Sequence, residues 1–234
     1  MKEKIIILST DTPHHRYFIN KLEKNNFHIS SYIFETESIK PSFNIKTSID
    51  HLQNKFEKKE FFSKEIKYEL IKEKIFKVKN INEKNSINLI KKFLPAKGII
   101  FGTRKISEDV IRLFKGNIYN VHRGITQRYR GLDSEYWSIY HSDYESIGVT
   151  IHKVSKILDQ GKILNQKRLK LKKNFKIHQL RFYTTVLAAN LMIDVLNKKI
   201  KKKYNQPNGR YYSFMPKNIK EKMIKKFNSH TKYI

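Results

Sequence analysis

Residues 120–137 read NVHRGITQRYRGLDSEYW and gather polar, cationic and aromatic side chains around two glycines. If the residues that lead into this stretch form a strand, Asn120 and His122 point to the same face, because side chains two positions apart do so. They would lie at the carboxyl end of that strand, where open α/β sheets bind their ligands. Asp159 follows another apolar run, in the sequence LDQG. An amide, an imidazole and a carboxylate that meet in one pocket suit proton transfer and stabilisation of an oxyanion.

Apolar runs and amphipathic stretches alternate along the rest of the main part of the chain. The apolar runs predict buried strands at residues 4–8, 27–34, 97–102 and 117–121. Residues 54–76, rich in lysine and glutamate, are expected to form one or two helices, and 176–200 the longest helix. The alternation predicts an α/β fold, with a Rossmann-like, mostly parallel sheet and helices on both faces.

The last part of the chain predicts a small extension, residues 201–234, that follows a main domain at 1–200. Residues 206–209 (QPNG) indicate the turn of a β-hairpin whose second arm, 210–215, is rich in aromatics. Pro216 then opens a short basic helix. Because such a hairpin is marginal alone, it needs a partner surface. Two candidates remain open: a second copy of the chain, which would make a homodimer, and the chain's own main domain.

Length and composition restrict the class of protein. A chain of 234 residues suits one domain with a small appendage. The absence of cysteine excludes disulfides, thiolate nucleophiles and cysteine-bound metal sites. No apolar run approaches the roughly 20 residues of a membrane span, and the first eight residues are too short and charged for a secretory signal. These features predict a cytoplasmic protein without a membrane partner.

The net charge of +28 raises the hypothesis of a nucleic-acid partner. Lysine outnumbers arginine and is spread over the whole chain, and Ile, Asn and Phe are plentiful while Gly and Pro are few. An A/T-rich coding sequence gives such a composition whatever the function, so we favour coding bias over a dedicated nucleic-acid surface. The positive field would still attract an anionic substrate such as a nucleotide diphosphate or a folate tail.

Five short motifs follow one another between residues 98 and 166: IIFGTRKI, NVH, YRG followed by Trp137, IGVTIHKV and LDQGKIL. In this order they resemble the 10-formyltetrahydrofolate-dependent formyltransferases, which formylate glycinamide ribonucleotide, methionyl-tRNA or amino sugars on nucleotides. The resemblance implies that residues 1–200 are a catalytic domain of the formyltransferase fold. It also implies that 10-formyltetrahydrofolate is the cosubstrate and that no metal takes part.

The resemblance assigns roles residue by residue. Asn120 would donate a hydrogen bond to the oxyanion, and His122 would take the proton of the attacking amine. Asp159 would hold the imidazole and raise its pKa. The cofactor-binding residues implied are Phe101, Gly102, Thr103, Arg104, Ser155, Lys156, Ile157, Leu158 and Asp159.

The details of the motifs are closest to the amino-sugar branch. Methionyl-tRNA enzymes carry a further C-terminal barrel that the residues after the long helix do not accommodate. Glycinamide ribonucleotide enzymes have a Gly-rich phosphate loop where this chain has STDTP at 9–13. We therefore expect formylation of a nucleotide-linked amino-dideoxy sugar, thymidine-linked, for O-antigen or another surface polysaccharide. The alternatives are methionyl-tRNA or glycinamide ribonucleotide as acceptor and, in another class, a basic nucleic-acid-binding protein on a decayed enzyme fold. The predicted substrate contacts are His15, Arg16, Arg123, Gln127, Arg128, Tyr129, Arg130 and Trp137.

Overall fold

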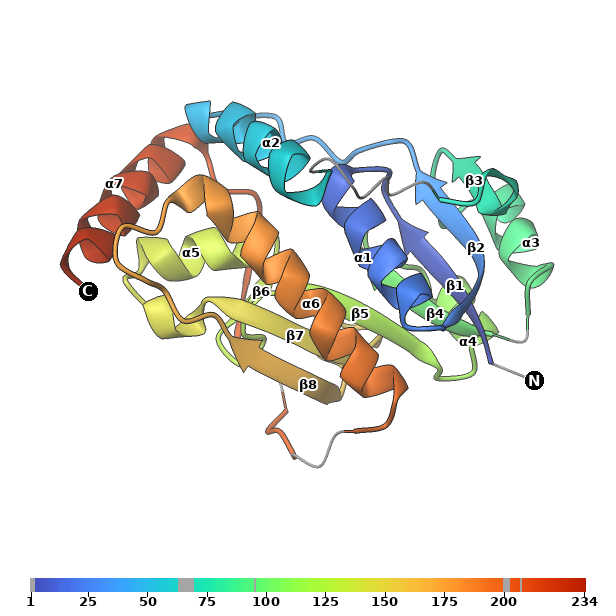
Figure 1. Ribbon diagram of the computed structural model, residues 1–234. Coiled ribbons are helices and arrows are strands. Elements are labelled where there is room, and N and C mark those ends of the chain that lie inside the picture. Colours follow the sequence, from blue (N-terminus) through green and yellow to red (C-terminus); the bar gives the residue numbers. More distant parts are fainter. Residues whose placement is uncertain (1–2, 63–69, 95, 200–202, 207) are drawn as a thin grey trace.

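A computed structural model describes residues 3–62, 70–94, 96–199, 203–206 and 208–234. A seven-stranded sheet in the order β3-β2-β1-β4-β5-β7-β8 forms its centre (Figure 1). The strands are β1 (Lys4–Ser9), β2 (His28–Glu35), β3 (Ile75–Val78), β4 (Lys97–Phe101), β5 (Ile118–Arg123), β7 (Gly148–Lys153) and β8 (Ile163–Arg168). The first five are parallel, whereas β7 runs antiparallel to both its neighbours. The predicted mostly parallel α/β fold is confirmed.

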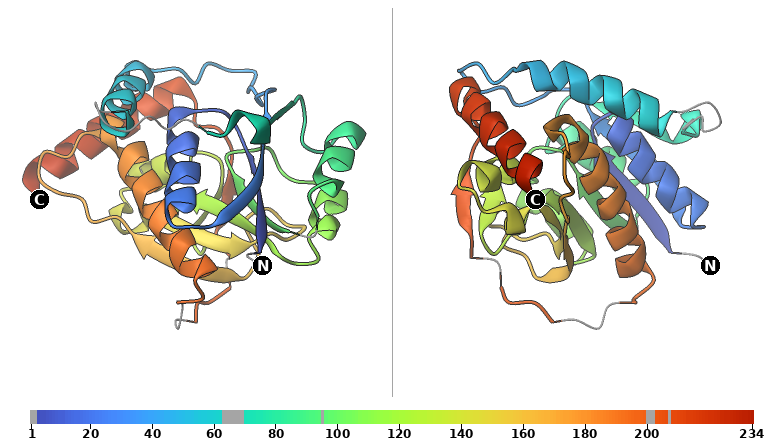
Figure 2. Two further views of the ribbon diagram at one scale, coloured as in Figure 1. Left: turned by 45° about the vertical axis from the view of Figure 1, so that its right-hand side comes forward. Right: turned by 60° about the vertical axis from the view of Figure 1, so that its left-hand side comes forward.

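Helices cover both faces of this sheet (Figures 1 and 2). The helices are α1 (Pro13–Lys24), α2 (Ser48–Phe61), α3 (Lys84–Lys91), α4 (Glu108–Leu113), α5 (Ser134–Tyr140), α6 (Leu180–Leu196) and α7 (Lys217–Tyr233), with short 3-10 turns η1 (Lys72–Lys74), η2 (Tyr144–Ser146) and η3 (Ile177–Gln179). In β1, Ile5 and Ile7 pack in the core that includes α1 and α6, whereas Ile6 and Leu8 pack in the core that includes α3 and α4. A continuous apolar run is needed because both faces of a parallel strand are buried.

Residues 63–69 of the helical prediction for 54–76 lie outside the described residues; the part up to Phe61 is helical, and residues 75–76 are not. Helix α2 begins earlier, at Ser48, where the Asp50 carboxylate accepts a hydrogen bond from the Thr47 backbone N–H at 2.7 Å. It ends at Phe61, and residues 75–78 form the edge strand β3, paired in parallel with β2. The sequence IFKV at 75–78 is long enough for an edge strand. Its apolar pattern is too short to be distinguished from the helical pattern of the charged stretch before it.

The C-terminal extension folds differently from the predicted hairpin. Strand β9 (Arg210–Tyr212) pairs in parallel with β6 (Tyr129–Gly131), and the described residues 203–206 contain no strand. Residues 202 and 207 of the predicted hairpin lie outside the described residues. Turn propensity is local, whereas the choice of a partner strand depends on distant parts of the chain, so the sequence signal was insufficient.

Helix α7 is longer than the short helix that Pro216 predicts. It packs against α5 and fully buries Met223 and Phe227 in a third cluster of apolar residues. Burial of a side chain of this size typically contributes about 1.5–3 kcal/mol. The partner of the extension is therefore the chain's own main domain, the second of the two candidates. The homodimer stays a prediction.

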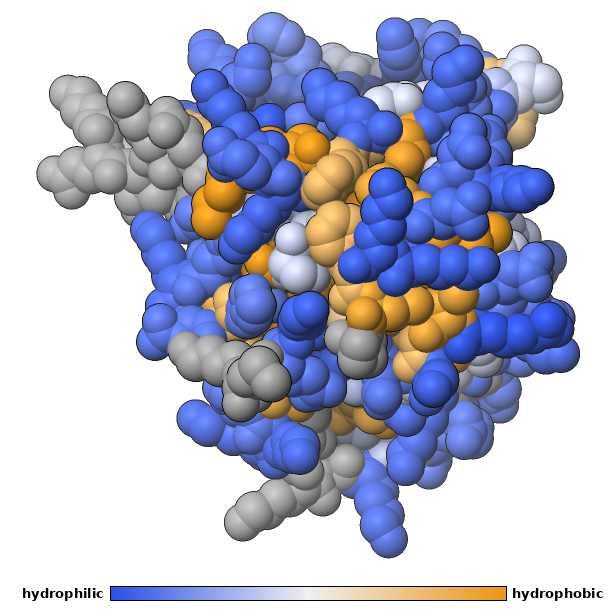
Figure 3. All heavy atoms as spheres, turned by 90° about the vertical axis from the view of Figure 1, so that its right-hand side faces the viewer, coloured by the Kyte–Doolittle hydropathy of each residue, from blue (hydrophilic) through white to orange (hydrophobic). Residues whose placement is uncertain are grey.

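The surface is rich in charge on the side of α3 and β3, with apolar groups showing between hydrophilic ones (Figure 3). Cations occur on every side of the sheet and are not confined to one element. Within the described ranges, no helix combines the length and the apolar character that crossing a bilayer requires.

Candidate active site

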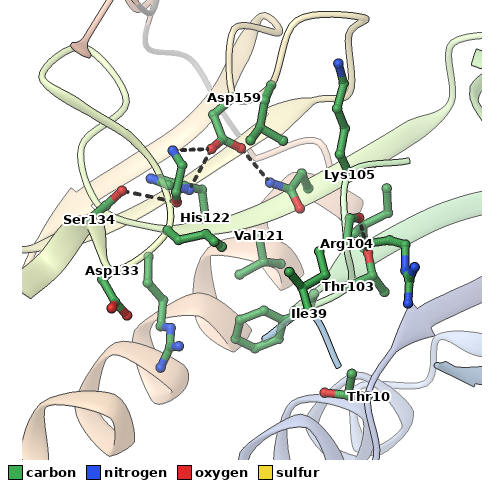
Figure 4. Close-up of a pocket in the computed structure, with 18 of the residues that line it drawn as sticks. Thr10, Ile39, Thr103, Arg104, Lys105, Val121, His122, Asp133, Ser134 and Asp159 are labelled. Carbon is green, nitrogen blue, oxygen red and sulfur yellow. Dashed lines mark hydrogen bonds and ion pairs between the residues drawn. The ribbon is translucent and has the colours of Figure 1, made fainter. Parts of the chain in front are cut away.

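A cavity of about 690 Å³ opens at the carboxyl ends of β1, β4 and β5. Its walls come from the ends of these strands, the loops at 131–136 and 154–159, the start of α6 and the C-terminal extension. Parallel strands end at one edge of a sheet, so residues far apart in sequence meet there. In Figure 4 the side chains of His122 and Asp159 point toward each other, with Asp133 and Ser134 on one side of them.

The predicted trio is brought together at this cavity. The Asp159 Oδ2 atom lies 3.3 Å from His122 Nδ1, and Asn120 Nδ2 donates a hydrogen bond to Asp159 Oδ1 at 3.2 Å. The backbone N–H of Gly131 donates to Asp159 Oδ2 at 2.8 Å. Asn120 and His122 lie on β5, two positions apart as the sequence predicts, and Asp159 lies in the loop after β7.

A second histidine, which the sequence reasoning did not select, completes the group. The antiparallel pairing of β5 and β7 places His152 opposite Asn120. Because Lys153 O can only accept, the 2.7 Å contact makes His152 Nδ1 the donor, and its Nε2 then accepts from Asn120 Nδ2 at 3.1 Å. Asn120, His122, His152 and Asp159 are called the Asp159 cluster below. His152 is part of the motif IGVTIHKV, but only the antiparallel pairing of β7 with β5 shows that it lies opposite Asn120.

Burial controls the charge of His122. It lowers the pKa of His122 below its ordinary value, although the Asp159 carboxylate acts in the opposite direction. The predicted upward effect of Asp159 on the pKa of His122 is thus present, but desolvation outweighs it and the net shift is downward. Burial also disfavours ionisation of Asp159, but His122, His152 and the Gly131 N–H outweigh it and hold the pKa of Asp159 well below its usual range.

Two glycines of the quoted motifs are fixed by close contacts. A Cβ atom on Gly161 of LDQG would lie 1.6 Å from Lys153 O, and one on Gly131 of YRG would lie 2.1 Å from Tyr212 O. Gly131 also has a φ of 89°, a backbone region that favours glycine. Gly161 thus lets the Asp159 loop approach the end of β7, and Gly131 lets strand β9 approach β6. The motif glycines thus serve the geometry of the site.

The candidate cofactor-binding residues divide into two groups. Phe101, Gly102, Thr103, Arg104, Ser155, Leu158 and Asp159 line the cavity. Lys156 and Ile157 do not line it: Lys156 Nζ pairs with Glu108 at 2.9 Å, and the Ile157 side chain is 59% exposed. The Arg104 guanidinium is held by the buried Glu35 carboxylate and by Glu37 O.

Of the candidate substrate contacts, only Arg123 and His15 line the cavity. His15 packs edge-on against Phe101, and burial lowers the pKa of His15 well below its usual value, so its ring is a neutral wall of the cavity. Within the described ranges, the Arg123 guanidinium makes no hydrogen bond or ion pair. It is thus available to a ligand.

The other candidate substrate contacts lie outside the cavity and bond within the chain. Arg130 donates to Leu158 O and Gly209 O, which ties the Asp159 loop to the extension. The remaining contacts are Arg16 with Asp11, Gln127 with Gln166, Arg128 with Asp143, Tyr129 stacked on Tyr212, and the Trp137 indole N–H with Ser213 O. A role for these residues in binding substrate has no support from their positions.

Several residues of the cavity wall were missed by the sequence reasoning. Glu135 comes from α5, Arg181 from α6, and Tyr211, Phe214 and Lys220 from the C-terminal extension. No local pattern marks them, because the extension reaches the cavity only through the pairing of β9 with β6 and the packing of α7 on α5.

Comparison with known proteins agrees with this geometry. Residues 3–196 match the family described as formyl transferase. The chain belongs to the formyl transferase family. The family resemblance read from the five motifs is therefore confirmed.

Named members of the formyl transferase family match parts of the chain. It is 32% identical over 177 residues to the bifunctional polymyxin resistance protein ArnA of Wigglesworthia glossinidia brevipalpis, a match covering 74% of the chain and 26% of that protein. It is 30% identical over 120 residues to the methionyl-tRNA formyltransferase of Finegoldia magna, covering 51% of the chain and 38% of that enzyme. The matches thus span well under half the length of these relatives.

Solved structures of formyltransferases share the fold. A sugar N-formyltransferase from a Shewanella species superimposes with a TM-score of 0.61 at 15% identity, over 90% of this chain and 76% of that one. The formyltransferase PseJ of Anoxybacillus kamchatkensis, solved with UDP-4,6-dideoxy-4-formamido-L-AltNAc and tetrahydrofolate, gives 0.55 at 16% identity, over 95% and 98% of the two chains. At these identities the likeness shows the fold.

Proposed function

We propose that the chain is a sugar N-formyltransferase, which moves a formyl group from 10-formyltetrahydrofolate to the amine of a nucleotide-linked amino sugar. The observation that carries this proposal is the Asp159 cluster, which joins an amide, a buried imidazole and an ionised carboxylate at the edge of a large cavity. Membership of the formyl transferase family supports the same chemistry.

The chemistry follows from the protonation states. The acceptor amine attacks the formyl carbon and forms the new C–N bond of a tetrahedral intermediate. The bond from that carbon to N10 of the folate then breaks, and the amine proton ends on N10. His122 is suited to relay this proton because burial lowers its pKa and favours the neutral ring. Its Nε2 atom lies 3.2 Å from Tyr129 O in this structure, so the ring must give up that contact to meet the amine. Asp159 stays ionised and fixes the orientation of the ring.

Asn120 is the proposed donor to the oxyanion of the tetrahedral intermediate. In this structure both protons of its Nδ2 are directed at protein atoms, Asp159 Oδ1 and His152 Nε2. To serve the oxyanion, the amide must exchange one of these contacts when substrates bind. Substrate binding and rearrangement of Asn120 are therefore coupled in the proposed mechanism.

The proposed cofactor region is the part of the cavity around residues 101–104 and the loop residues Ser155 and Leu158. The acceptor takes the opposite part, where the free Arg123 guanidinium suits a phosphate or another oxygen-rich group. The structure of PseJ contains a UDP-linked sugar, so uridine joins thymidine as a candidate base. A role in O-antigen or other surface polysaccharide remains part of the proposal.

The main alternative acceptor is methionyl-tRNA, because relatives of that name match half of the chain at about 30% identity. The strong positive charge suits a tRNA as well. In this case the cationic surface, and not Arg123 alone, would bind the acceptor.

A panel of acceptors tests the proposal. The protein is incubated with 10-formyltetrahydrofolate and, in turn, UDP- and dTDP-linked amino sugars, glycinamide ribonucleotide and methionyl-tRNA, and release of tetrahydrofolate is measured. We expect turnover with a nucleotide-linked amino sugar, and a loss of about 100- to 1000-fold in Asn120→Ala, the usual effect of removing an oxyanion donor. Turnover with methionyl-tRNA alone would establish the alternative, and salt-sensitive RNA binding without turnover would favour a binding protein.

A further inference from the structure

Glu135 is a buried carboxylate in the wall of the cavity that the proposed mechanism does not use. It lies in the first turn of α5, and only 6% of the residue is exposed. Within the described parts of the chain, its Oε1 atom has no hydrogen-bond partner. A buried carboxylate oxygen without a donor destabilises a folded protein, so a residue of this kind is usually kept for a ligand.

The Thr184 hydroxyl lies near enough to lower the pKa of Glu135, but neither of the neighbouring arginines forms an ion pair with this carboxyl group. Arg181 of α6 is already bound by the carboxylate of Glu57 and by Asn54, at 2.8 Å from its Nη2 to each. Arg123 of β5 lies near enough to favour the ionised form of Glu135, but the two side chains form no ion pair. The wall thus presents a carboxyl group and a guanidinium to the same cavity, and neither has an ion-pair partner among the described residues.

The position of α5 places this carboxylate near the proposed reaction centre. A Cβ atom built on Gly124 would lie 2.9 Å from both His122 Nε2 and the Ser134 Cβ, so α5 begins beside His122. Glu135 is the next residue along α5 and lines the same cavity. A molecule whose amine is held at His122 therefore extends past Glu135.

We propose that Glu135 determines acceptor specificity, with its carboxylate turning into the cavity to accept a hydrogen bond from an N–H or O–H group of the amino sugar. This inference rests on the proposed function. The acceptor it selects carries a donor for Glu135 and an anionic or oxygen-rich group for Arg123, as a sugar linked to a diphosphate does. Burial raises the pKa of Glu135 to about 7, and a bound donor would favour its ionised form.

Binding without catalysis tests the role of Glu135. The dissociation constants of a UDP-linked amino sugar, of the same sugar nucleotide with a hydroxyl in place of the amine, and of UDP alone are measured by calorimetry for the parent and for Glu135→Gln. We expect Glu135→Gln to bind the amino sugar about 10- to 100-fold more weakly, the range for a hydrogen bond to a charged group, and UDP equally well. Equal weakening for the hydroxyl analogue would show that an O–H group can supply the donor, and weakening for the amine alone would assign the donor to the amine.

Glu145→Gln, the same change at an exposed position, serves as the control. Equal amino-sugar binding by the parent and Glu135→Gln would overturn the inference, as would a parent that binds the amino sugar no better than UDP. The unfolding temperature without ligand provides a second measurement. A rise in Glu135→Gln at pH 8 is expected of an unpaired carboxylate, and a fall would show a structural partner and overturn the inference. Because neither measurement requires formyl transfer, they still decide the role of Glu135 if the panel of acceptors shows no turnover.

Discussion

Two sets of residues in the cavity wall, called its two ends below, differ in how their polar groups are satisfied. In the Asp159 cluster, both carboxylate oxygens of Asp159 and both ring nitrogens of His152 have partners within the chain. At the other end, Glu135 Oε1 and the Arg123 guanidinium have none among the described residues. The first end is organised before substrate arrives, as efficient catalysis requires. The second remains unsatisfied until a ligand supplies the missing groups.

The organised end is expected to give the largest effect. Asp159 has a φ of 54°, a conformation that asparagine tolerates, so Asp159→Asn removes the charge with little backbone strain. We expect kcat/KM for formyl transfer to fall on the order of 1000- to 10,000-fold, as when a carboxylate that orients a catalytic histidine is replaced. Thermal unfolding should show that the variant is folded.

Asp143→Asn is the matched control, because Asp143 pairs with Arg128 outside the cavity. Its rate should stay within about twofold of the parent. Near-normal turnover of Asp159→Asn would show that the cluster is a structural network and would remove the contrast between the two ends.

The buried carboxyl group of Glu135, in the unsatisfied end, should make the free energy of unfolding depend on pH. Burial raises the pKa of Glu135 from its ordinary 4.5 to about 7 and outweighs Arg123, Thr184 and Arg181, which lower it, whereas Asp133 raises it further. The folded state therefore binds this proton more tightly than the unfolded state. The stabilisation is complete below about pH 4.5 and is lost as pH rises to about 7.

Glu135→Gln removes this titration. Relative to the parent, its free energy of unfolding should increase between pH 4.5 and 8 by about 3 kcal/mol at most, by the linkage between pKa and stability. Urea unfolding of both proteins across this range measures the difference, in which the other titrating groups cancel. A difference that does not change with pH would mean that Glu135 is satisfied in the folded state.

The smallest expected effect compares two arginines of the same sequence stretch. Arg123 lines the cavity, whereas Arg128 is exposed and pairs with Asp143. Arg123→Gln should raise the KM for the acceptor about tenfold, the lower range for a lost charge-assisted hydrogen bond, with little change in kcat. Arg128→Gln should leave both constants unchanged. Steady-state kinetics with acceptor varied at saturating folate distinguishes the two, and equal effects would show that the surface field, and not the cavity, attracts the acceptor.

The sequence was informative where a local pattern fixes the outcome. Buried parallel strands require continuous apolar runs, and the spacing of Asn120 and His122 fixes their common face on a strand. The ordered motifs added Asp159 and the family. His152 was quoted within a motif but not selected, because its contact with Asn120 depends on β7 running antiparallel to β5.

The C-terminal extension shows where local patterns fail. The turn signal at 206–209 predicted a hairpin, but β9 pairs with β6, because Gly131 has no side chain to block the approach of Tyr212 O. Strand pairing is decided by partners far apart in the sequence, which no short window contains.

By itself, the sequence determined the α/β class, the parallel core strands, the family and the trio of Asn120, His122 and Asp159, since each depends on residues close in the chain or on ordered motifs. Only the tertiary structure decided the neutral state of His122, the cavity walls from the C-terminal extension and the unpaired state of Glu135. Burial and the absence of a partner are properties of everything that surrounds a group, and those surroundings are assembled only when the chain folds.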